Sequence, residues 1–291
     1  MSSDIMPMTE PRPRRQRSQD SGAADAALLF DEPGPRGRIL IAIGSVVAVI
    51  GIAVLAAAVL YRLDLAGQLD YPKWRYFLGQ SVVSQLLEAA GTTLTLGGVA
   101  AVLTFPLGIA LGWLRLLDNR PIKWLVGLWV DAMRAVPMLL LVYFFLLLVP
   151  RFATISDFWK LALPIVMCTS ATTAEVFRSG VRALDRGQTE AAWALGMSPS
   201  LTMRLILAPQ ALRLMLPTLI TQMVTIIKGT TLAYVLAYPE LMYRGSTMIG
   251  QAKIDAHLSV FFQTYVIIAV LYIIVNWSLG ALARYIESRT R

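Results

Sequence analysis

Two ionisable side chains, Glu175 and Lys228, lie within long apolar stretches of this sequence. A charge inside hydrocarbon needs a counter-charge, a polar cavity or a ligand. Lys228 could therefore meet Glu175, a partner subunit or a ligand carboxylate. Glu175 could equally pair with Arg178, three residues further along the same helix. Threonine hydroxyls stand beside both charges and complete a candidate polar path, whose residues are Thr172, Thr173, Glu175, Lys228, Thr230 and Thr231.

The residues around these charges allow a structural as well as a functional interpretation. Threonine hydroxyls can bond to carbonyls of their own helix, so several of them mean little alone. Gly229, directly after Lys228, lets a helix loosen and expose backbone groups, as transporter spans do at binding sites. We favour a role for Lys228 in the candidate polar path over a purely structural ion pair, and leave both open for Glu175.

Metal and covalent chemistry have little support in this sequence. The chain has one cysteine, Cys168, and one histidine, His257, which excludes an intrachain disulfide and any cluster of His and Cys metal ligands. A membrane enzyme would need clustered catalytic groups within its spans, and only Glu175 qualifies. We expect no metal, no cofactor and no enzymatic activity.

The elements that position Glu175 and Lys228 are predicted to be transmembrane helices. Hydrophobic residues make up 56% of the chain, charged residues 15%, and mean hydropathy is +0.61. About 20 apolar residues in a helix cross a hydrocarbon core. The sequence predicts an all-α integral membrane protein with about six transmembrane helices, at residues 39–60, 92–113, 124–149, 160–181, 214–238 and 258–283.

The distribution of positive charge predicts topology. The net charge is +8, but Lys and Arg are spread between the spans, which argues against a nucleic-acid partner. They are more numerous in the segments that are cytoplasmic if the N-terminus is inside, so we expect both termini and residues 182–213 in the cytoplasm. Residues 1–38 have the composition of a disordered tail. Residues 39–60 are predicted to be an additional N-terminal membrane helix rather than a cleaved signal peptide.

The third predicted span begins with a charged pair. Asp131 and Arg134 are three residues apart and Pro137 follows closely. In the interpretation we favour, the two charges pair with each other where the helix enters the membrane. In the alternative, Arg134 lines a polar route or braces a helix break.

Residues 182–209 predict a compact helix, turn, helix. "TEAAWAL" contains good helix formers, with Ala and Leu on a helical face, and Gly196 follows where a helix favours a left-handed residue. Ser198 can cap a second helix and Pro199 suits its first position. We expect that helix to run to about Leu207 and to stop at Pro209.

The spacing in this segment resembles the "EAA" loop of bacterial ABC importer permeases. The matching residues are Glu190, Ala191, Ala192, Gly196, Ile206 and Pro209, and Ala208 stands where the family pattern has Leu. The resemblance implies that residues 186–209 form coupling helices that seat in a cleft of a cytoplasmic ATPase. An ordinary amphipathic connector is the alternative.

The segment "LLFDEPGPRGR" and the overall arrangement look most like the glutamate permeases of this class. Other stretches resemble its polar amino acid permeases more generally. They are "RAVPMLLLVYFFLL", "TTAEVFRSGVRALDRGQTEAAWALG" and "IIKGTTLAYVLAYPEL", and the resemblance covers residues 90–285. It implies the fold of a type I ABC importer permease in a bacterial cell membrane. It also implies a cytoplasmic ATPase dimer, a second permease of the same or a related chain, and an extracytoplasmic substrate-binding protein.

Other transport mechanisms are weaker alternatives. The chain has no G-x-x-x-x-G-K-[ST] stretch to cradle ATP phosphates, so the energy would come from a partner. A secondary transporter or channel would need no ATPase, but no duplicated half suggests an inverted-repeat carrier. An ABC permease for another small polar solute is the closer alternative.

Overall fold

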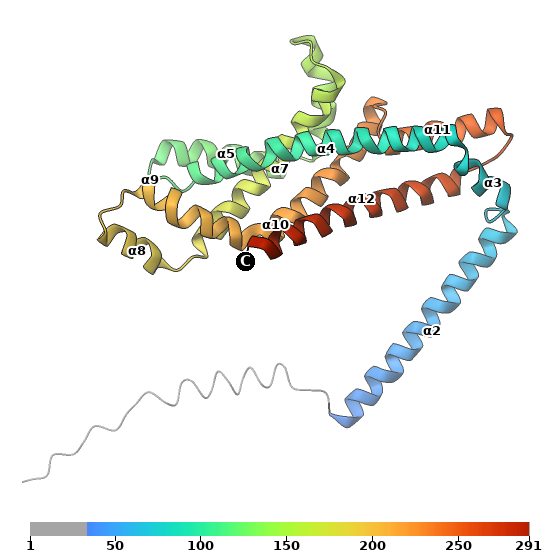
Figure 1. The fold of residues 1–291 in the computed structure, drawn as a ribbon, viewed down its shortest axis with the longest axis horizontal. Helices are drawn as coiled ribbons and strands as arrows, with labels where there is room; N and C mark the ends of the chain where they lie inside the picture. Colours follow the sequence, from blue (N-terminus) through green and yellow to red (C-terminus); the bar gives the residue numbers. More distant parts are fainter. Residues whose placement is uncertain (1–33, 291) are drawn as a thin grey trace, which may run out of the picture. The chain divides into compact units, whose positions relative to one another are not determined.

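The computed structural model describes residues 34–290, and every regular element in that range is helical (Figure 1). The chain divides into two units, residues 1–66 and residues 67–291. Most of the predicted cytoplasmic tail, residues 1–33, lies outside the described residues.

The first unit contains the helix α2 (Pro35–Leu65). Gly34 is its N-cap and Pro35 takes the first helical position, where a missing N–H costs nothing. The helix starts before the predicted boundary at residue 39. Its 31 residues extend about 46 Å at 1.5 Å per residue, enough to cross a bilayer. None of its side chains is buried within the protein, which suits contact with lipid.

The second unit is a bundle of longer helices with short connecting turns. Its elements are α3 (Tyr71–Arg75), η1 (Tyr76–Leu78), α4 (Gln80–Leu114), α5 (Arg120–Ala135), α6 (Met138–Tyr143), η2 (Phe144–Leu148), η3 (Val149–Arg151), α7 (Asp157–Arg182), α8 (Arg186–Ala194), α9 (Pro199–Thr202), η4 (Met203–Leu207), α10 (Ala208–Gly229), η5 (Thr230–Leu236), α11 (Leu241–Asp255) and α12 (Phe261–Thr290). The elements η2 and η4 are π-helical turns.

The helix α7 is central to this bundle and packs against α4, α5, α6 and α10. Its contact with α4 depends on two glycines spaced like a G-x-x-x-G motif. A methyl group at Gly112 would lie 2.6 Å from the carbonyl oxygen of Ala174, and one at Gly108 would lie 2.9 Å from that of Ser170. The absence of side chains there lets the two backbones approach closely. In Figure 1, α8 and α9 lie at one end of this unit and α11 near the other.

Within residues 34–290, the structure contains fewer clear membrane spans than the six predicted. Four helical segments are long and apolar enough to cross a membrane: 35–65, 80–114, 199–236 and 261–282. The pair α5 and α6 with its continuation to Arg151 would make a fifth. The fourth predicted span, residues 160–181, corresponds to α7. That helix does not reach the same hydropathy because it carries hydroxyl residues and charges.

The third predicted span is not one straight helix. The segments Arg120–Ala135 and Met138–Arg151 meet at a bend of 98°. Pro137 disfavours helical geometry in the residue before it, and Val136 has extended angles of φ −78° and ψ 128°. The predicted span over 124–149 thus consists of two helices joined at a sharp bend, which together are apolar and long enough for one broken span.

The second short helix does not stop at Pro209. The chain stays helical from Pro199 through the π-helical turn η4 into α10, where Pro209 occupies the first turn. A π turn widens the helix and shifts its hydrogen bonds, so the proline ring and its missing N–H are accommodated. Residues 199–236 consequently form one long helical segment.

Candidate functional sites

The turn between α8 and α9 has the local geometry that the sequence predicts. Gly196 is left-handed, with φ of +75°. Its N–H donates to the carbonyl of Trp193 at 2.9 Å, and the N–H of Met197 donates to that of Ala192 at 3.1 Å. These two bonds define a Schellman motif, which closes the C-terminal end of α8. Ser198 then caps α9 by accepting a 3.3 Å hydrogen bond from the N–H of Leu201.

The residues of the predicted coupling loop differ in exposure. Ala192 is buried, Ile206 is half-buried, and Glu190, Ala191, Gly196 and Pro209 are exposed. Large apolar residues of this loop also face outward, among them Trp193, which is 57% exposed, and Leu195, which is 82% exposed. This turn therefore presents an apolar surface beside its exposed acidic residue, a pattern that the motif residues alone do not reveal.

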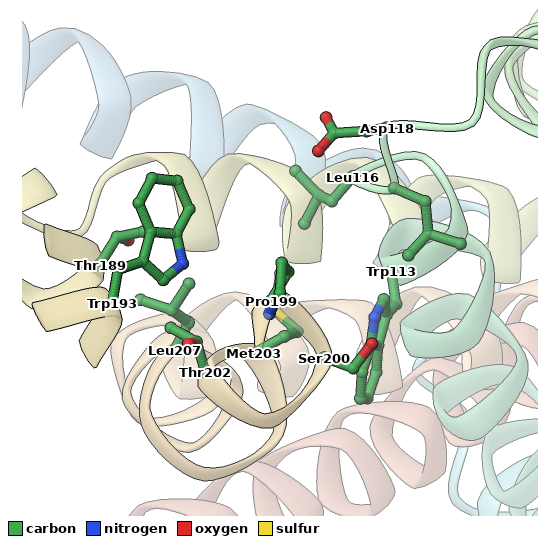
Figure 2. A pocket seen from close by; sticks show the side chains of 11 residues that line it. Trp113, Leu116, Asp118, Thr189, Trp193, Pro199, Ser200, Thr202, Met203 and Leu207 are labelled. Carbon is green, nitrogen blue, oxygen red and sulfur yellow. The ribbon is translucent and has the colours of Figure 1, made fainter. Parts of the chain in front are cut away.

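A pocket lies between this turn and the end of α4. Figure 2 shows Trp113 of α4 and Trp193 of α8 on opposite sides of it in this view, with Pro199 and Met203 between them. Asp118, from the turn that follows α4, also lines it. The pocket is thus lined by residues of α4, α8, α9 and η4.

Glu175 lies in an arginine cluster rather than beside Lys228. Arg115, the C-cap residue of α4, donates to its carboxylate at 2.9 Å. Arg178 donates to both carboxylate oxygens, one of them through Nε at 3.1 Å. The predicted pairing of Glu175 with Arg178 is therefore present. Arg115 is an additional partner that the sequence did not indicate, because the two residues are 60 positions apart.

Asp131 also belongs to this cluster. Its carboxylate lies 3.4 Å from Nη1 of Arg115. No ion pair joins it to Arg134 within the described residues, so the pairing that we favoured is wrong. The reason is the packing of α4 on α5, which brings the Arg115 guanidinium to Asp131 and against Gly127.

Two threonines of the predicted path bond within α7. Thr173 is buried and donates to the carbonyl of Thr169 at 2.9 Å, and Thr172 is half-buried and donates to that of Cys168 at 3.2 Å. Thr173 also packs against Gly108 of α4. In this conformation Thr173 contributes to helix packing, as hydroxyls inside apolar helices often do.

Lys228 lies at the point where α10 changes to the 3₁₀ helix η5. Its side chain is exposed and forms no ion pair within the described part of the chain. The helix does loosen after Gly229, as expected, and η5 ends at the left-handed residue Ala237, with φ of 53°. Thr231 donates to the carbonyl of Lys228 at 2.7 Å, and buried Thr230 donates to that of Ile227 at 2.7 Å. The structure therefore brings Lys228, Thr230 and Thr231 together and places Glu175 in a separate cluster.

Sequence comparison identifies the protein family to which this chain belongs. The profile described as "Binding-protein-dependent transport system inner membrane component" matches residues 104–291. A probable glutamine ABC transporter permease, GlnP of Bacillus subtilis (strain 168), is 33% identical over 68% of this chain and 89% of its own length. The glutamate transport system permease GluD of Corynebacterium glutamicum is 33% identical over 77% of this chain and 82% of its own length.

Solved structures agree on the fold. A crystal structure titled as an amino acid ABC transporter with histidines matches 72% of this chain and 95% of its own, with a TM-score of 0.64 and 24% identity. The inward-facing MetNI methionine ABC transporter matches 73% of this chain and 99% of its own, with a TM-score of 0.60 and 16% identity. The chain thus has the fold of a type I ABC importer permease and belongs to the family of binding-protein-dependent transport system inner membrane components, as a multi-pass transport subunit that is not an enzyme.

Proposed function

We propose that this chain is a permease subunit of an ATP-driven importer that moves a polar amino acid, glutamate, across a bacterial cell membrane into the cytoplasm. The observation that supports it most is the α8–Gly196–α9 turn with the EAA spacing in a chain of this family. Relatives named for glutamine and for glutamate favour an amino acid as the substrate.

The proposed complex contains two cytoplasmic ATPases, a second permease of the same or a related chain, and an extracytoplasmic substrate-binding protein. The family description itself names a binding-protein-dependent system. Exposed Trp193 and Leu195 on the α8 turn suit insertion into a cleft of the ATPase, because large apolar side chains commonly anchor protein interfaces.

The mechanism that we propose uses the α8–α9 turn as a rigid handle. The Schellman motif and the Ser198 cap hold the two helices in a defined geometry. α8 follows α7 after three residues and α9 continues into α10 through η4, so the handle is joined to two helices of the bundle. Closure of the ATPase dimer would move these helices between two arrangements.

The proposed substrate contact is made by Lys228 and the hydroxyl residues Thr230 and Thr231. Lys228 is a cation without an ion-pair partner in the described residues, at a helix break between a span and its 3₁₀ continuation. A substrate carboxylate would supply the missing negative charge. Thr172, Thr173 and Glu175 would then support α7 beside the path.

Two measurements test the proposed function. A tagged chain purified in mild detergent should bring down an ATPase with a G-x-x-x-x-G-K-[ST] motif and a substrate-binding protein. Cells that lack the chain should lose ATP-dependent uptake of labelled glutamate, and the wild-type chain should restore it. Competition by unlabelled glutamine and aspartate would rank the substrates. Uptake that is unchanged by loss of the chain, or that continues without ATP, would contradict the proposal.

A further inference from the structure

A second buried acid lies beside the segment that carries Lys228. Glu240 connects η5 to α11 and its exposed fraction is 0%. No lysine, arginine or histidine forms an ion pair with it within the described residues. A buried carboxyl group without a cation must be stabilised by hydrogen bonds, and such groups in membrane proteins mark functional positions.

The two carboxyl oxygens of Glu240 have different partners. Oε1 accepts a 2.8 Å hydrogen bond from the N–H of Tyr243, so Glu240 caps α11. Oε2 accepts a 2.8 Å hydrogen bond from the hydroxyl of Tyr272 on α12. Capping of α11 needs only the first oxygen. The bond to Tyr272 therefore ties α11 to α12 and requires another explanation.

The same contact extends to α4 and η5. Thr93 of α4 accepts a 3.2 Å hydrogen bond from the N–H of Leu241, next to Glu240. The side chains of Thr93 and Thr230 lie near the Tyr272 hydroxyl, and Thr230 also packs against Gly97 of α4. Thr230 is buried and is the first residue of η5, two positions after Lys228. One polar cluster of Glu240, Tyr272, Thr93 and Thr230 thus joins four elements at the helix break.

An aromatic contact supports the same arrangement. Tyr234 of η5 and Tyr243 of α11 have ring centroids 6.3 Å apart. Tyr243 also donates the backbone bond to Glu240. The 3₁₀ segment therefore contacts α11 through Tyr234 and lies near Tyr272 of α12 at Thr230. A 3₁₀ helix of seven residues has poorer hydrogen-bond geometry than an α-helix, so it needs such outside support.

From this geometry we propose that Glu240 and Tyr272 are positioning residues that hold the 3₁₀ segment, and with it Lys228 and Thr231, in the conformation that meets the substrate. This inference rests on the proposed function, because it takes that segment to line the path. Glu240 and Tyr272 act on the segment through Thr230 and need not touch the substrate.

The test measures the conformation of the segment without transport. A cysteine at Thr231, in a Cys168→Ser background, reports the reaction rate with a small maleimide in the purified protein. Tyr272→Phe removes only the hydroxyl that bonds Glu240. It should change this rate by about fivefold or more, as expected for the loss of one hydrogen bond to a buried carboxyl group. The matched control is Tyr265→Phe on the same helix, since Tyr265 makes an aromatic contact with Phe261 but no hydrogen bond in the described residues.

Further variants separate positioning from general loosening. Glu240→Gln keeps an oxygen that accepts from the N–H of Tyr243 and places an amide N–H that can donate to the hydroxyl of Tyr272, so it should stay near the wild-type rate. Glu240→Ala should reproduce Tyr272→Phe. A cysteine at Ser200 in α9 should react at an unchanged rate in every variant. An unchanged rate at position 231 in Tyr272→Phe, or an equal change at position 200, would overturn the inference. Neither outcome depends on whether the chain imports glutamate, which the uptake assay decides separately.

Discussion

The guanidinium of Arg115 donates a 2.9 Å hydrogen bond to the carboxylate of Glu175 and so joins the end of α4 to α7. Both side chains are largely buried, with 14% and 21% of their surface exposed. Arg178 completes the neutralisation of Glu175 from the same helix. Glu175 is therefore engaged by two arginines in this conformation, and Lys228 is not one of its partners.

We expect Arg115→Ala to destabilise the protein because it leaves Glu175 with one cation and opens the contact between α4 and α7. The loss should be about 2 kcal/mol, typical of a hydrogen bond to a charged group. Lys160→Ala is the control. Lys160 pairs with Asp157 at the start of α7, and the Asp157 side chain is 60% exposed. That change should cost less than about 1 kcal/mol. Thermal unfolding in detergent compares the two, and equal losses would contradict the prediction.

We expect Gly112→Val to disrupt the packing of α4 on α7. The new side chain would meet the carbonyl oxygen of Ala174 at 2.6 Å, and backbone cannot move aside as a flexible side chain can. Overpacking of this kind costs about 1–3 kcal/mol. Gly98→Val on the same helix is the control, because nothing lies within 4 Å of its added carbon. The measurement is the yield of folded protein and its unfolding temperature. Similar behaviour of both variants would show that the close approach is unimportant.

We expect Gly196→Val to uncouple transport while leaving the protein in the membrane. There is open space around Gly196, so the effect arises from its φ of +75°, which a β-branched residue adopts poorly. Gly196→Asn should retain most activity because asparagine tolerates the left-handed region. Uptake and co-purification of the ATPase are the measurements. Normal uptake by the valine variant would remove the turn from the coupling mechanism.

We expect Lys228→Met to reduce uptake sharply at normal expression, since the substrate carboxylate would lose its counter-charge. Because Glu175 is paired with Arg115 and Arg178, adding Glu175→Gln should not restore activity. Lys253→Met in α11 serves as a control for removing an exposed positive charge. Labelled glutamate uptake compares the variants. Recovery in the double variant would instead assign Lys228 to a structural pair with Glu175 in another state of the cycle.

We expect the two ends of the second unit to lie on opposite sides of the membrane, with α8 and α9 in the cytoplasm. Ser200→Cys in α9 and Ser81→Cys in α4, each in a Cys168→Ser background, are conservative and exposed in the structure. The 35 residues of α4 extend about 52 Å, so Ser81 lies beyond the hydrocarbon core. An impermeant thiol reagent should label only position 81 in intact cells. Labelling of position 200 from outside would reverse the proposed topology.

The local structure of the α8–α9 turn could be predicted from its sequence. A left-handed glycine, a serine cap and a proline at the first helical position each depend on backbone bonds within a few residues. The apolar segments are equally local, because hydropathy and length suffice to indicate a helix that can cross a membrane. These features need no knowledge of what packs against them.

Tertiary packing decided which side chains meet. Arg115 reaches Glu175 because the glycines of α4 allow it to pack closely on α7, and it reaches Asp131 because α4 also packs on α5. Tyr272 reaches Glu240 because α11 and α12 lie together. Both prolines are strong helix breakers, but their effects differ. The chain bends by 98° at Pro137, whereas it stays helical at Pro209, which follows a π turn. Helix propensity describes the free-energy cost of placing each residue in an isolated helix. The neighbouring helices determine where that cost is offset, and therefore which predicted pairs and breaks the protein contains.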